Sequence, residues 1–327
     1  MNYSFSGTCA NDHDQFFGCL ITILKQSILP KQIILVDSGE VNIEKKIMQY
    51  LGLMDIKLIY IFKKFSRVKS LNLALDESTS EFSFRFDSRS RFYKHYAKNA
   101  LRILCDKKLN ASVVGGAPRM LPSSNQFEPV LCSDIMKRPY VFFYPNHRKT
   151  EYSGFTSSLY LGCFETDLLK TIRFKEKKIP LSEDSLIIND FLAKGFKAFV
   201  SSKIKISYIC RESFTNILKL FNTYGYCRAN TILLSKKLFI SIRHFYAFLF
   251  FSSLILIIYY YSYLYVLFLP IILLFFNFIG ELFFSKKDFK IYIPFYATLC
   301  QFSWLVGFLW SLLSIFKKKS LKSNFIS

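Results

Sequence analysis

The chain has 327 residues and a formal net charge of +21, and hydrophobic residues make up 51% of it. This composition excludes an intrinsically disordered chain, because disordered chains are poor in hydrophobic residues. The length suits one domain of ordinary catalytic size and an appended segment. The sequence contains no motif typical of nucleic-acid binding, so the excess positive charge favours phosphorylated substrates or anionic lipid headgroups as partners.

Short apolar runs alternate with helical patterns in the first part of the chain. Continuous apolar runs predict strands that are buried on both faces, as in a parallel sheet. We expect such strands at 32–37, 57–62, 82–87 and 112–116. Apolar residues at helical spacing predict helices at 14–26, 41–52, 67–77 and 92–107. This alternation predicts an α/β fold with a doubly wound, Rossmann-like sheet.

The pattern is weaker after residue 116. Residues 118–153 are rich in proline, serine and arginine, which predicts a loop. The segment 181–195 predicts a helix whose first turn contains Glu183 and Asp184. Short strands are expected at 158–164, 196–200 and 204–209, and a further helix at 213–235.

Two long stretches near the C-terminus, 245–280 and 291–316, contain no charged residue. About 20 apolar residues span a bilayer, so these stretches predict transmembrane helices. We therefore expect a polar domain at 1–235 and a membrane domain at 236–327, with two or three passes and a basic tail. Basic residues precede the first stretch and no signal peptide is recognisable, which favours a cytosolic polar domain. Two passes would leave the tail inside and three would leave it outside.

Metal and disulfide patterns are absent from the sequence. The eight cysteines include no C-x-x-C pair, and the four histidines form no cluster with zinc spacing. Reduced thiols are the expected state in the cytosol.

Two aspartates, Asp37 and Asp87, stand at the carboxyl ends of predicted strands. In doubly wound sheets, ligands bind beyond these ends. Asp37 begins the sequence "DSG", which is also typical of an ordinary Asx-turn. Asp87 lies in "FRFDSRSRFY", where the corner either holds a charged ligand or is a solvated set of weak ion pairs.

Four stretches resemble family 2 glycosyltransferases of the GT-A fold in their order and spacing: "ILKQSILPKQIILVDSGE", "SLNLALDESTSEFSFRFDSRSRF", "VVGG" and "LSEDSLIINDFLAKG". The resemblance extends over residues 4–230. Within the family, the chain is most similar to the bacterial succinoglycan-type glucosyltransferases, which carry an R-x-D-x-H/R-x-x-Y stretch. It implies a GT-A domain, of the nucleotide-diphospho-sugar transferase type, followed here by C-terminal transmembrane helices.

The resemblance implies a donor site at the strand ends. Asp37 would bind the nucleobase or ribose of a nucleotide-sugar, and Asn11 would lie in the stretch that wraps the base. The family usually carries D-x-D where this chain has Asp87-Ser88-Arg89. Either Asp87 binds Mg²⁺ or Mn²⁺, or Arg89 and the nearby Arg91 neutralise the diphosphate with less need for metal.

Further donor contacts are implied for Arg67 and Asn72, which match a donor-contacting stretch of the family. On the acceptor side, Glu183-Asp184 matches an E-D pair. Asp184 would be the base that takes the acceptor hydroxyl proton. Acids in a first helical turn are also common for electrostatic reasons alone.

The remaining matches concern the acceptor and the phosphates. Gly115 and Gly116 either let the backbone pass close to a substrate or form a plain strand-to-loop turn. Arg211 matches a basic residue that follows the base in the family. The Q-x-x-R-W motif of polymer-forming relatives is absent, which favours transfer of a single sugar.

The activity implied is that of an inverting hexosyltransferase at the bacterial inner membrane. It would move one sugar from a nucleotide-sugar, expected to be UDP-linked, to a lipid-linked saccharide in surface polysaccharide or exopolysaccharide synthesis. One alternative is a polyprenyl-phosphate glycosyltransferase. Another is a noncatalytic GT-A-like membrane protein, which the missing second acid of D-x-D would explain.

Overall fold

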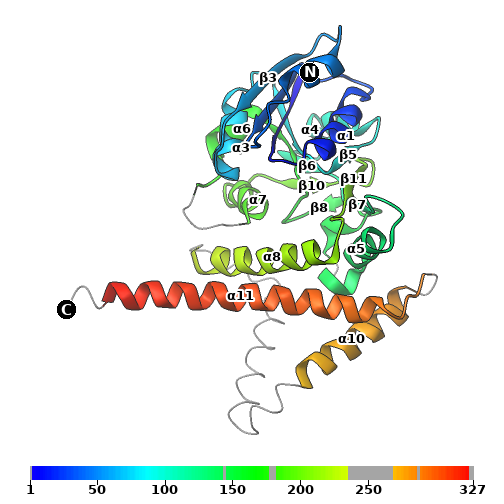
Figure 1. Cartoon of the computed structure of the whole chain (residues 1–327). Coiled ribbons are helices and arrows are strands. Elements are labelled where there is room, and N and C mark those ends of the chain that lie inside the picture. Colours follow the sequence, from blue (N-terminus) through cyan, green and yellow to red (C-terminus); the bar gives the residue numbers. More distant parts are fainter. Residues whose placement is uncertain (1, 143–144, 177–181, 235–267, 286–287, 324–327) are drawn as a thin grey trace. The chain divides into compact units, whose positions relative to one another are not determined.

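The computed structural model describes residues 2–142, 145–176, 182–234, 268–285 and 288–323. The chain contains two compact units (Figure 1). The first comprises Met1–Leu121, Asn146–Lys178 and Glu183–Cys210; the second comprises Pro122–Pro145, Ile179–Ser182 and Arg211–Ser327. The predicted division at residue 235 into cytosolic and membrane domains remains a prediction.

The first unit contains an eight-stranded sheet of order β3-β2-β1-β4-β9-β6-β10-β8. Its strands are β1 (Tyr3–Cys9), β2 (Gln32–Asp37), β3 (Lys57–Phe62), β4 (Phe82–Asp87), β6 (Val113–Gly115), β8 (Gly154–Phe155), β9 (Cys163–Glu165) and β10 (Ala198–Val200). β1, β2, β3 and β4 are parallel, as predicted for the strands at 32–37, 57–62 and 82–87. β9 runs antiparallel to both β4 and β6, so the sheet is mixed.

Helices cover both faces of this sheet (Figure 1). They are α1 (His13–Leu24), α2 (Glu44–Leu51), α3 (Arg67–Asp76), α4 (Tyr96–Leu104), α6 (Thr166–Ile172) and α7 (Glu183–Ala193). On β2, Ile33 and Leu35 join the core under α1, α2 and α4, whereas Ile34 and Val36 pack on the opposite side with α3. Burial on both faces explains the continuous apolar runs.

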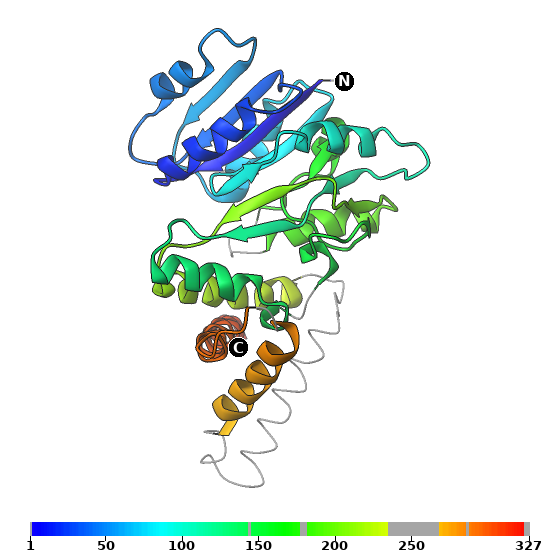
Figure 2. The ribbon, with the colours of Figure 1, turned by 90° about the vertical axis from the view of Figure 1, so that its right-hand side faces the viewer.

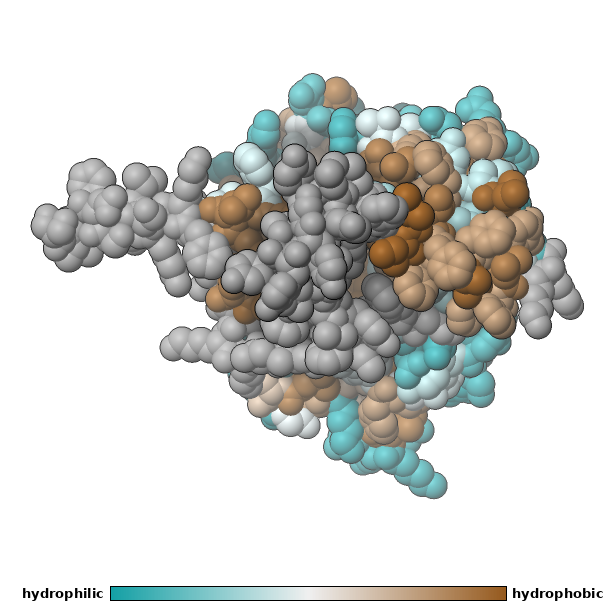
Figure 3. All heavy atoms as spheres, turned by 90° about the horizontal axis from the view of Figure 1, so that it is seen from below, coloured by the Kyte–Doolittle hydropathy of each residue, from teal (hydrophilic) through white to brown (hydrophobic). Residues whose placement is uncertain are grey.

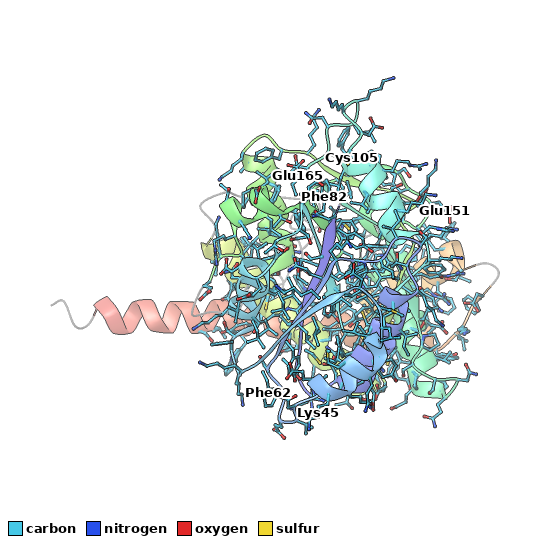
Figure 4. All side chains as sticks on the ribbon, turned by 90° about the horizontal axis from the view of Figure 1, so that it is seen from above. Lys45, Phe62, Phe82, Cys105, Glu151 and Glu165 are labelled. Carbon is cyan, nitrogen blue, oxygen red and sulfur yellow. The ribbon has the colours of Figure 1, made fainter. Side chains whose placement is uncertain are left out.

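Figure 4 shows the two ends of the strands of this sheet. Phe82 begins β4 and lies near Glu165, its partner in the antiparallel pair with β9. Phe62 is the last residue of β3 and lies at the opposite end, where the parallel strands have their carboxyl ends. The edge near Phe62 is therefore the one at which a ligand of an α/β sheet is expected.

The prediction of a loop over 118–153 was wrong. A second, three-stranded sheet contains β5 (Ser90–Phe92), β11 (Ile206–Ile209) and β7 (Pro118–Leu121) in the order β5-β11-β7. α5 (Phe127–Lys137) and the short 3-10 helices η1 (Pro139–Phe142) and η2 (Asn146–Arg148) follow β7. The prolines and polar residues of this stretch concealed the buried Leu131 and Ile135, which lie at helical spacing on α5.

Two other predicted boundaries also moved. β5 takes the first residue of the helix expected at 92–107, because Phe92 is buried in the core of the first unit. The strand expected at 158–164 is confined to β9, and Leu161 before it adopts a positive φ of 62° that a strand does not allow.

The second unit is helical (Figure 2). Its long helices are α8 (Phe214–Leu234), α10 (Phe268–Phe284) and α11 (Ile293–Ser323). α8 packs along α11, where the Ser311 hydroxyl donates to Asn230 at 2.7 Å. The backbones approach closely at Gly307, where a Cβ atom would lie 2.0 Å from the Asn222 carbonyl oxygen.

A buried charge network ties α10 to the segment after α5. Glu281 of α10 is 0% exposed, and both of its oxygens accept a hydrogen bond from Arg138 at 2.9 Å. The Tyr140 hydroxyl donates to the same carboxylate at 2.8 Å. Asp288 is a weaker partner of Arg138, at 3.4 Å and 59% exposed. A buried carboxylate requires such pairing, because an unpaired charge in the interior is very costly.

Candidate functional site

The strand-end aspartates lie on either side of the end of β1. Asp37 of β2 is opposite Cys9, and Asp87 of β4 is opposite Thr8. Because these strands are parallel, both carboxylates lie at the same edge of the sheet, as the sequence predicted. The structure thus brings Asp37 and Asp87 together, one on each side of β1.

Asp37 is fully buried and accepts hydrogen bonds on both oxygens. Oδ2 accepts from the Tyr60 hydroxyl at 2.9 Å and lies 3.1 Å from Nε2 of His13. Oδ1 accepts from the Gly39 N–H at 2.8 Å, which is the Asx-turn that the sequence also allowed. Asp37 is therefore both a turn residue and the centre of a polar cluster.

Cys9, His13 and Asp37 are close enough to suggest a metal site, since their ligand atoms lie within 4.8 Å of one another. Their hydrogen bonding indicates otherwise. The Cys9 thiol donates to Asp12 at 3.2 Å, and burial together with the Asp12 charge raises the pKa of that thiol. A protonated thiol is a poor metal ligand. We interpret the cluster as a buried, hydrogen-bonded polar cluster.

Asn11 lies close to this cluster. It adopts a positive φ of 59°, and its Oδ1 accepts from the Glu40 N–H at 2.9 Å. Asparagine tolerates this left-handed conformation better than most residues. The contact joins the loop after β1 to the loop after β2, at the strand ends where the resemblance predicted that the base binds.

Arg67, at the start of α3, connects Asp87 with the acid pair. Its Nε donates to Glu183 at 2.5 Å, and its Nη2 lies 3.5 Å from Asp87. The Arg67 side chain is half exposed, whereas Glu183 and Asp87 are mostly covered. A residue from each of α3, β4 and α7 therefore meets in one cluster, although 116 positions separate Arg67 from Glu183 in the sequence.

Asp184 pairs with a different arginine. Its Oδ1 accepts from Nη1 of Arg85 at 2.6 Å. Arg85 is 2% exposed, whereas the Asp184 side chain is 36% exposed. Burial alone would raise the pKa of Asp184, but Arg85 and Arg67 outweigh it, and the pKa lies below its ordinary value. Asp184 is therefore an ionised, accessible carboxylate at neutral pH.

The arginines that follow Asp87 point into the protein. Nη1 of Arg89 donates to the Cys210 carbonyl at 3.2 Å, and its side chain is buried. The Arg91 guanidinium donates to both the backbone and the side chain of Gln15 and to two carbonyls of its own turn. The structure thus gives Arg91 a structural role, against the idea that it neutralises a diphosphate. The Arg89 guanidinium is held at the Cys210 carbonyl, and its charge helps to lower the pKa of Asp12, which burial alone would raise.

Asn72 faces the core. Its amide donates to the Phe174 carbonyl at 2.8 Å and accepts from the Phe174 N–H at 3.0 Å. This reciprocal pair fixes the end of α6 to α3. The geometry supports a structural role for Asn72 in place of the donor contact that the sequence suggested.

The two glycines after β6 differ. A Cβ atom at Gly116 would lie 1.7 Å from the Ile204 carbonyl oxygen, so only glycine fits there. At Gly115 the nearest atoms would be 3.4 Å away, an ordinary distance. Gly116 thus serves backbone packing within the first unit. Arg211 belongs to the second unit, immediately after β11, so its predicted role remains a prediction.

Sequence reasoning missed three members of the site. Arg85 is the first arginine of the R-x-D-x-H/R stretch but was given no role, and its position between Phe84 and Phe86 in a buried strand was a further signal. Tyr60 lies between two isoleucines in the apolar run of β3, and nothing in the sequence distinguished it as a site residue. His13 was not assigned a role, because the four histidines form no cluster in the sequence.

Comparison with solved structures supports this architecture. The mannosyltransferase PcManGT from Pyrobaculum calidifontis, in complex with GDP-Man and Mn²⁺, matches 94% of this chain and 87% of its own, with a TM-score of 0.60 and 15% identity. The two proteins share a fold. The GT-A-like fold that the resemblance implied is thereby confirmed, as a mixed α/β sheet. At this identity the likeness concerns the fold alone.

Another match is S. aureus TarS 1-349 in complex with UDP-GlcNAc, with a TM-score of 0.47 and 19% identity over 75% of this chain and 69% of that one. No protein-family model matches the chain, and no curated protein sequence is significantly similar to it. The more specific resemblance to succinoglycan-type enzymes stays a prediction.

Proposed function

We propose that the chain is an inverting glycosyltransferase that moves one sugar from a nucleotide-sugar donor to a lipid-linked saccharide. One observation carries the proposal: Arg67 contacts both Asp87 and Glu183. This contact joins the strand end that would hold the donor diphosphate to the helix start that would hold the base. An inverting transfer needs these two groups in one site.

The chemistry follows from the roles of these residues. The acceptor hydroxyl attacks the anomeric carbon while Asp184 takes its proton. The bond from that carbon to the diphosphate breaks, and the nucleoside diphosphate leaves with the electron pair. The anomeric centre inverts, and no covalent enzyme intermediate forms. Arg67 is half exposed beside Asp87 and can approach the leaving group, where positive charge stabilises the developing negative charge.

The donor would be UDP-linked by the resemblance, whereas the mannosyltransferase of similar fold is in complex with GDP-Man. Asp37, with Tyr60 and His13, forms a polar cluster at the adjoining strand end, beside which the nucleoside would bind. Both donor classes fit this description. The test of function therefore compares donors that carry different nucleotides.

A divalent metal fits this site in part. Mg²⁺ and Mn²⁺ prefer oxygen ligands, and Asp87 offers one oxygen facing Arg67 while the other accepts from the Arg89 N–H at 3.0 Å. Serine and arginine follow where a second carboxylate is usual, so the donor phosphates would have to supply other ligands. Asp87 would hold such a metal, whose chemistry is to offset diphosphate charge.

A lipid-linked acceptor is supported by the apolar surface of the second unit (Figure 3). Large apolar side chains on α10 and α11 are exposed: Ile271, Phe275, Phe276, Phe283, Phe284, Phe295, Val306, Trp310 and Leu313. Exposed apolar patches of this kind are typical of protein or membrane contacts. Combined with the net charge of +21, they favour an anionic membrane surface.

Among the described helices, α11 alone has a segment long and apolar enough to cross a membrane, Ile293–Ser314, judged by length and composition. α10 contributes a shorter apolar segment, Pro270–Phe284. Most of the first predicted stretch, 245–280, lies outside the described residues. The multi-pass location at a bacterial inner membrane and the link to surface polysaccharide are therefore parts of the proposal.

The test is donor turnover by the purified chain in detergent with bacterial lipid extract. UDP-, GDP- and dTDP-sugars are each supplied with and without Mn²⁺, beside the variant Asp184→Asn. We expect release of nucleoside diphosphate from one donor class and its loss in the variant. Release that survives in Asp184→Asn would refute Asp184 as the base. Transfer to bare polyprenyl phosphate, or donor binding with no turnover on any acceptor, would favour the two alternatives named from the sequence.

A further inference from the structure

A buried arginine on the central strand β4 takes no direct part in the proposed proton transfer. Arg85 is 2% exposed and its neighbours Phe84 and Phe86 fill the core on the opposite face. Burial of a guanidinium group costs free energy unless a charge and hydrogen bonds compensate it. An apolar residue would stabilise the strand with less cost, so the arginine must serve a purpose beyond packing.

The purpose is indicated by its partners. Nη1 donates to Asp184 at 2.6 Å, and the guanidinium carbon lies 4.9 Å from the centre of the Phe174 ring. Among the residues that the structure describes, Nε of Arg85 has no hydrogen-bond partner. Nη1 also donates to the Leu161 carbonyl, at a longer distance of 3.5 Å. The carboxylate is thus the nearest partner of the arginine, and it is the proposed base.

The ring is itself fixed in place. Asn72 makes two hydrogen bonds to the backbone of Phe174, and Arg173 forms a two-fold ion pair with Asp76 at 2.7 and 2.9 Å. α3 thus holds two adjacent residues, Arg173 and Phe174, in place. A chain of contacts leads from Asn72 through Phe174 and Arg85 to Asp184.

We infer that Arg85 is a positioning residue for the base: it fixes one oxygen of Asp184 and leaves the carboxylate ionised and facing the acceptor, while Phe174 and Asn72 hold Arg85. This inference rests on the proposed function. In the described residues, no hydrogen bond to the second oxygen of Asp184 is formed, and the side chain is 36% exposed. That oxygen is the one that meets the acceptor hydroxyl.

Other charged groups near Asp184 are distinguishable from Arg85. Arg67 contacts the neighbouring Glu183 and Asp87, and acts on Asp184 only through space. Tyr160 is buried nearby, and burial raises the pKa of its hydroxyl, followed by the charge of Asp87 and, more weakly, that of Asp184, so it stays neutral. Arg85 is the cation in direct contact with the base.

The experiment measures kcat, the donor KM and the pH profile of the full chain in detergent for Arg85→Lys, Arg85→Gln and Phe174→Leu. In Arg85→Gln we expect kcat to fall about 10²-fold with the donor KM changed less than about twofold, because misplacing a catalytic group costs rate and not donor binding. The acidic limb of the profile should move up by about 1–3 pH units, since the base loses its cation. Arg85→Lys should recover part of both effects.

Phe174→Leu keeps the cation and tests positioning alone. It should lower kcat at least about fivefold, with a smaller shift of the pH profile than in Arg85→Gln. Arg102→Gln, on the exposed side of α4, is the matched control and should behave as the wild type.

The outcomes separate the inference from the proposed function. A wild-type chain that turns over no donor overturns the function and the inference with it. An active wild type whose Arg85 and Phe174 variants retain kcat and the pH profile overturns the inference alone. If Arg85→Gln does not fold, Arg85→Lys and Phe174→Leu decide between the same two results.

Discussion

Replacing Glu281 with glutamine should destabilise the helical second unit. The substitution preserves the shape of the side chain and removes its charge. Arg138 would then remain 7% exposed without its main counter-ion. Asp288 lies 3.4 Å from the guanidinium but is largely in solvent, so it compensates little.

The magnitude follows from the burial of the pair. Removal of one partner of a buried ion pair costs about 3–5 kcal/mol, because the other charge stays buried and unpaired. The partial help from Asp288 places our expectation at the lower end, about 3 kcal/mol. At about 2–4 °C per kcal/mol for a unit of this size, the unfolding temperature should fall by about 6–12 °C.

Tryptophan fluorescence is the appropriate assay. The chain has two tryptophans, Trp304 and Trp310, and both lie in α11. The signal therefore reports the second unit without a contribution from the first. Thermal unfolding of wild type and Glu281→Gln, followed by this fluorescence, gives the difference directly.

Two further variants make the test specific. Asp288→Asn removes the exposed partner of the same arginine and should change the unfolding free energy by at most about 1 kcal/mol. A double variant with methionine at both Arg138 and Glu281 should lose less stability than Glu281→Gln, because no buried charge is left unpaired. A loss below about 1 kcal/mol in Glu281→Gln would refute the reasoning.

Three other predictions concern the first unit. Asp184→Asn should lower kcat by about 10²–10⁴-fold with little change in donor KM, measured by nucleoside diphosphate release. Gly116→Ala should destabilise the unit by about 1–3 kcal/mol, read by circular dichroism, because its Cβ would overlap the Ile204 carbonyl. The pKa values of Asp12 and Asp184 are lowered in the folded state, so their stabilisation is present above an unfolded value of about 3.9 and is lost as the pH falls through the lower folded values.

The packing prediction and the pH prediction each have a matched control. Gly115→Ala should be nearly neutral, since the nearest atoms to its Cβ are 3.4 Å away; equal losses at both glycines would contradict the packing argument. In Asp12→Asn, stability should fall less steeply below about pH 4 than in the wild type. A slope as steep as that of the wild type would count against the Asp12 assignment.

The parallel half of the fold was predictable because its strands are buried on both faces. β2, β3 and β4 have the predicted bounds, since a continuous apolar run that ends at an aspartate or a charged segment leaves few alternatives. The three-residue β9 and β10 are too short for such a pattern, and the antiparallel position of β9 depends on partners far away in the sequence. The hydrophobic periodicity of the sequence cannot reveal that position.

The candidate site also has residues whose positions the sequence could predict and residues whose contacts it could not. Asp37, Asp87 and the acid pair were predictable because strand ends and helix starts are visible in the sequence. Arg85 and Asn72 were not, since their roles depend on which residues α3, α6 and α7 place opposite them. Sequence spacing gives no distance between residues 99 positions apart, as Arg85 and Asp184 are.

The place of β9 between β4 and β6 has a consequence for how the chain folds. β3, β2, β1 and β4 come from the first 87 residues and can pair as they emerge during synthesis. The sheet cannot close across its middle until β9 is available, at Cys163–Glu165, and β10 follows only at Ala198–Val200. Such long-range pairing is slow, because loop closure must precede the contacts that reward it. Glu183 and Asp184 lie between these two strands in the sequence, so the acid pair takes its place only when the sheet is being completed, and a partly synthesised chain has the strand ends with Asp37 and Asp87 before it has Asp184.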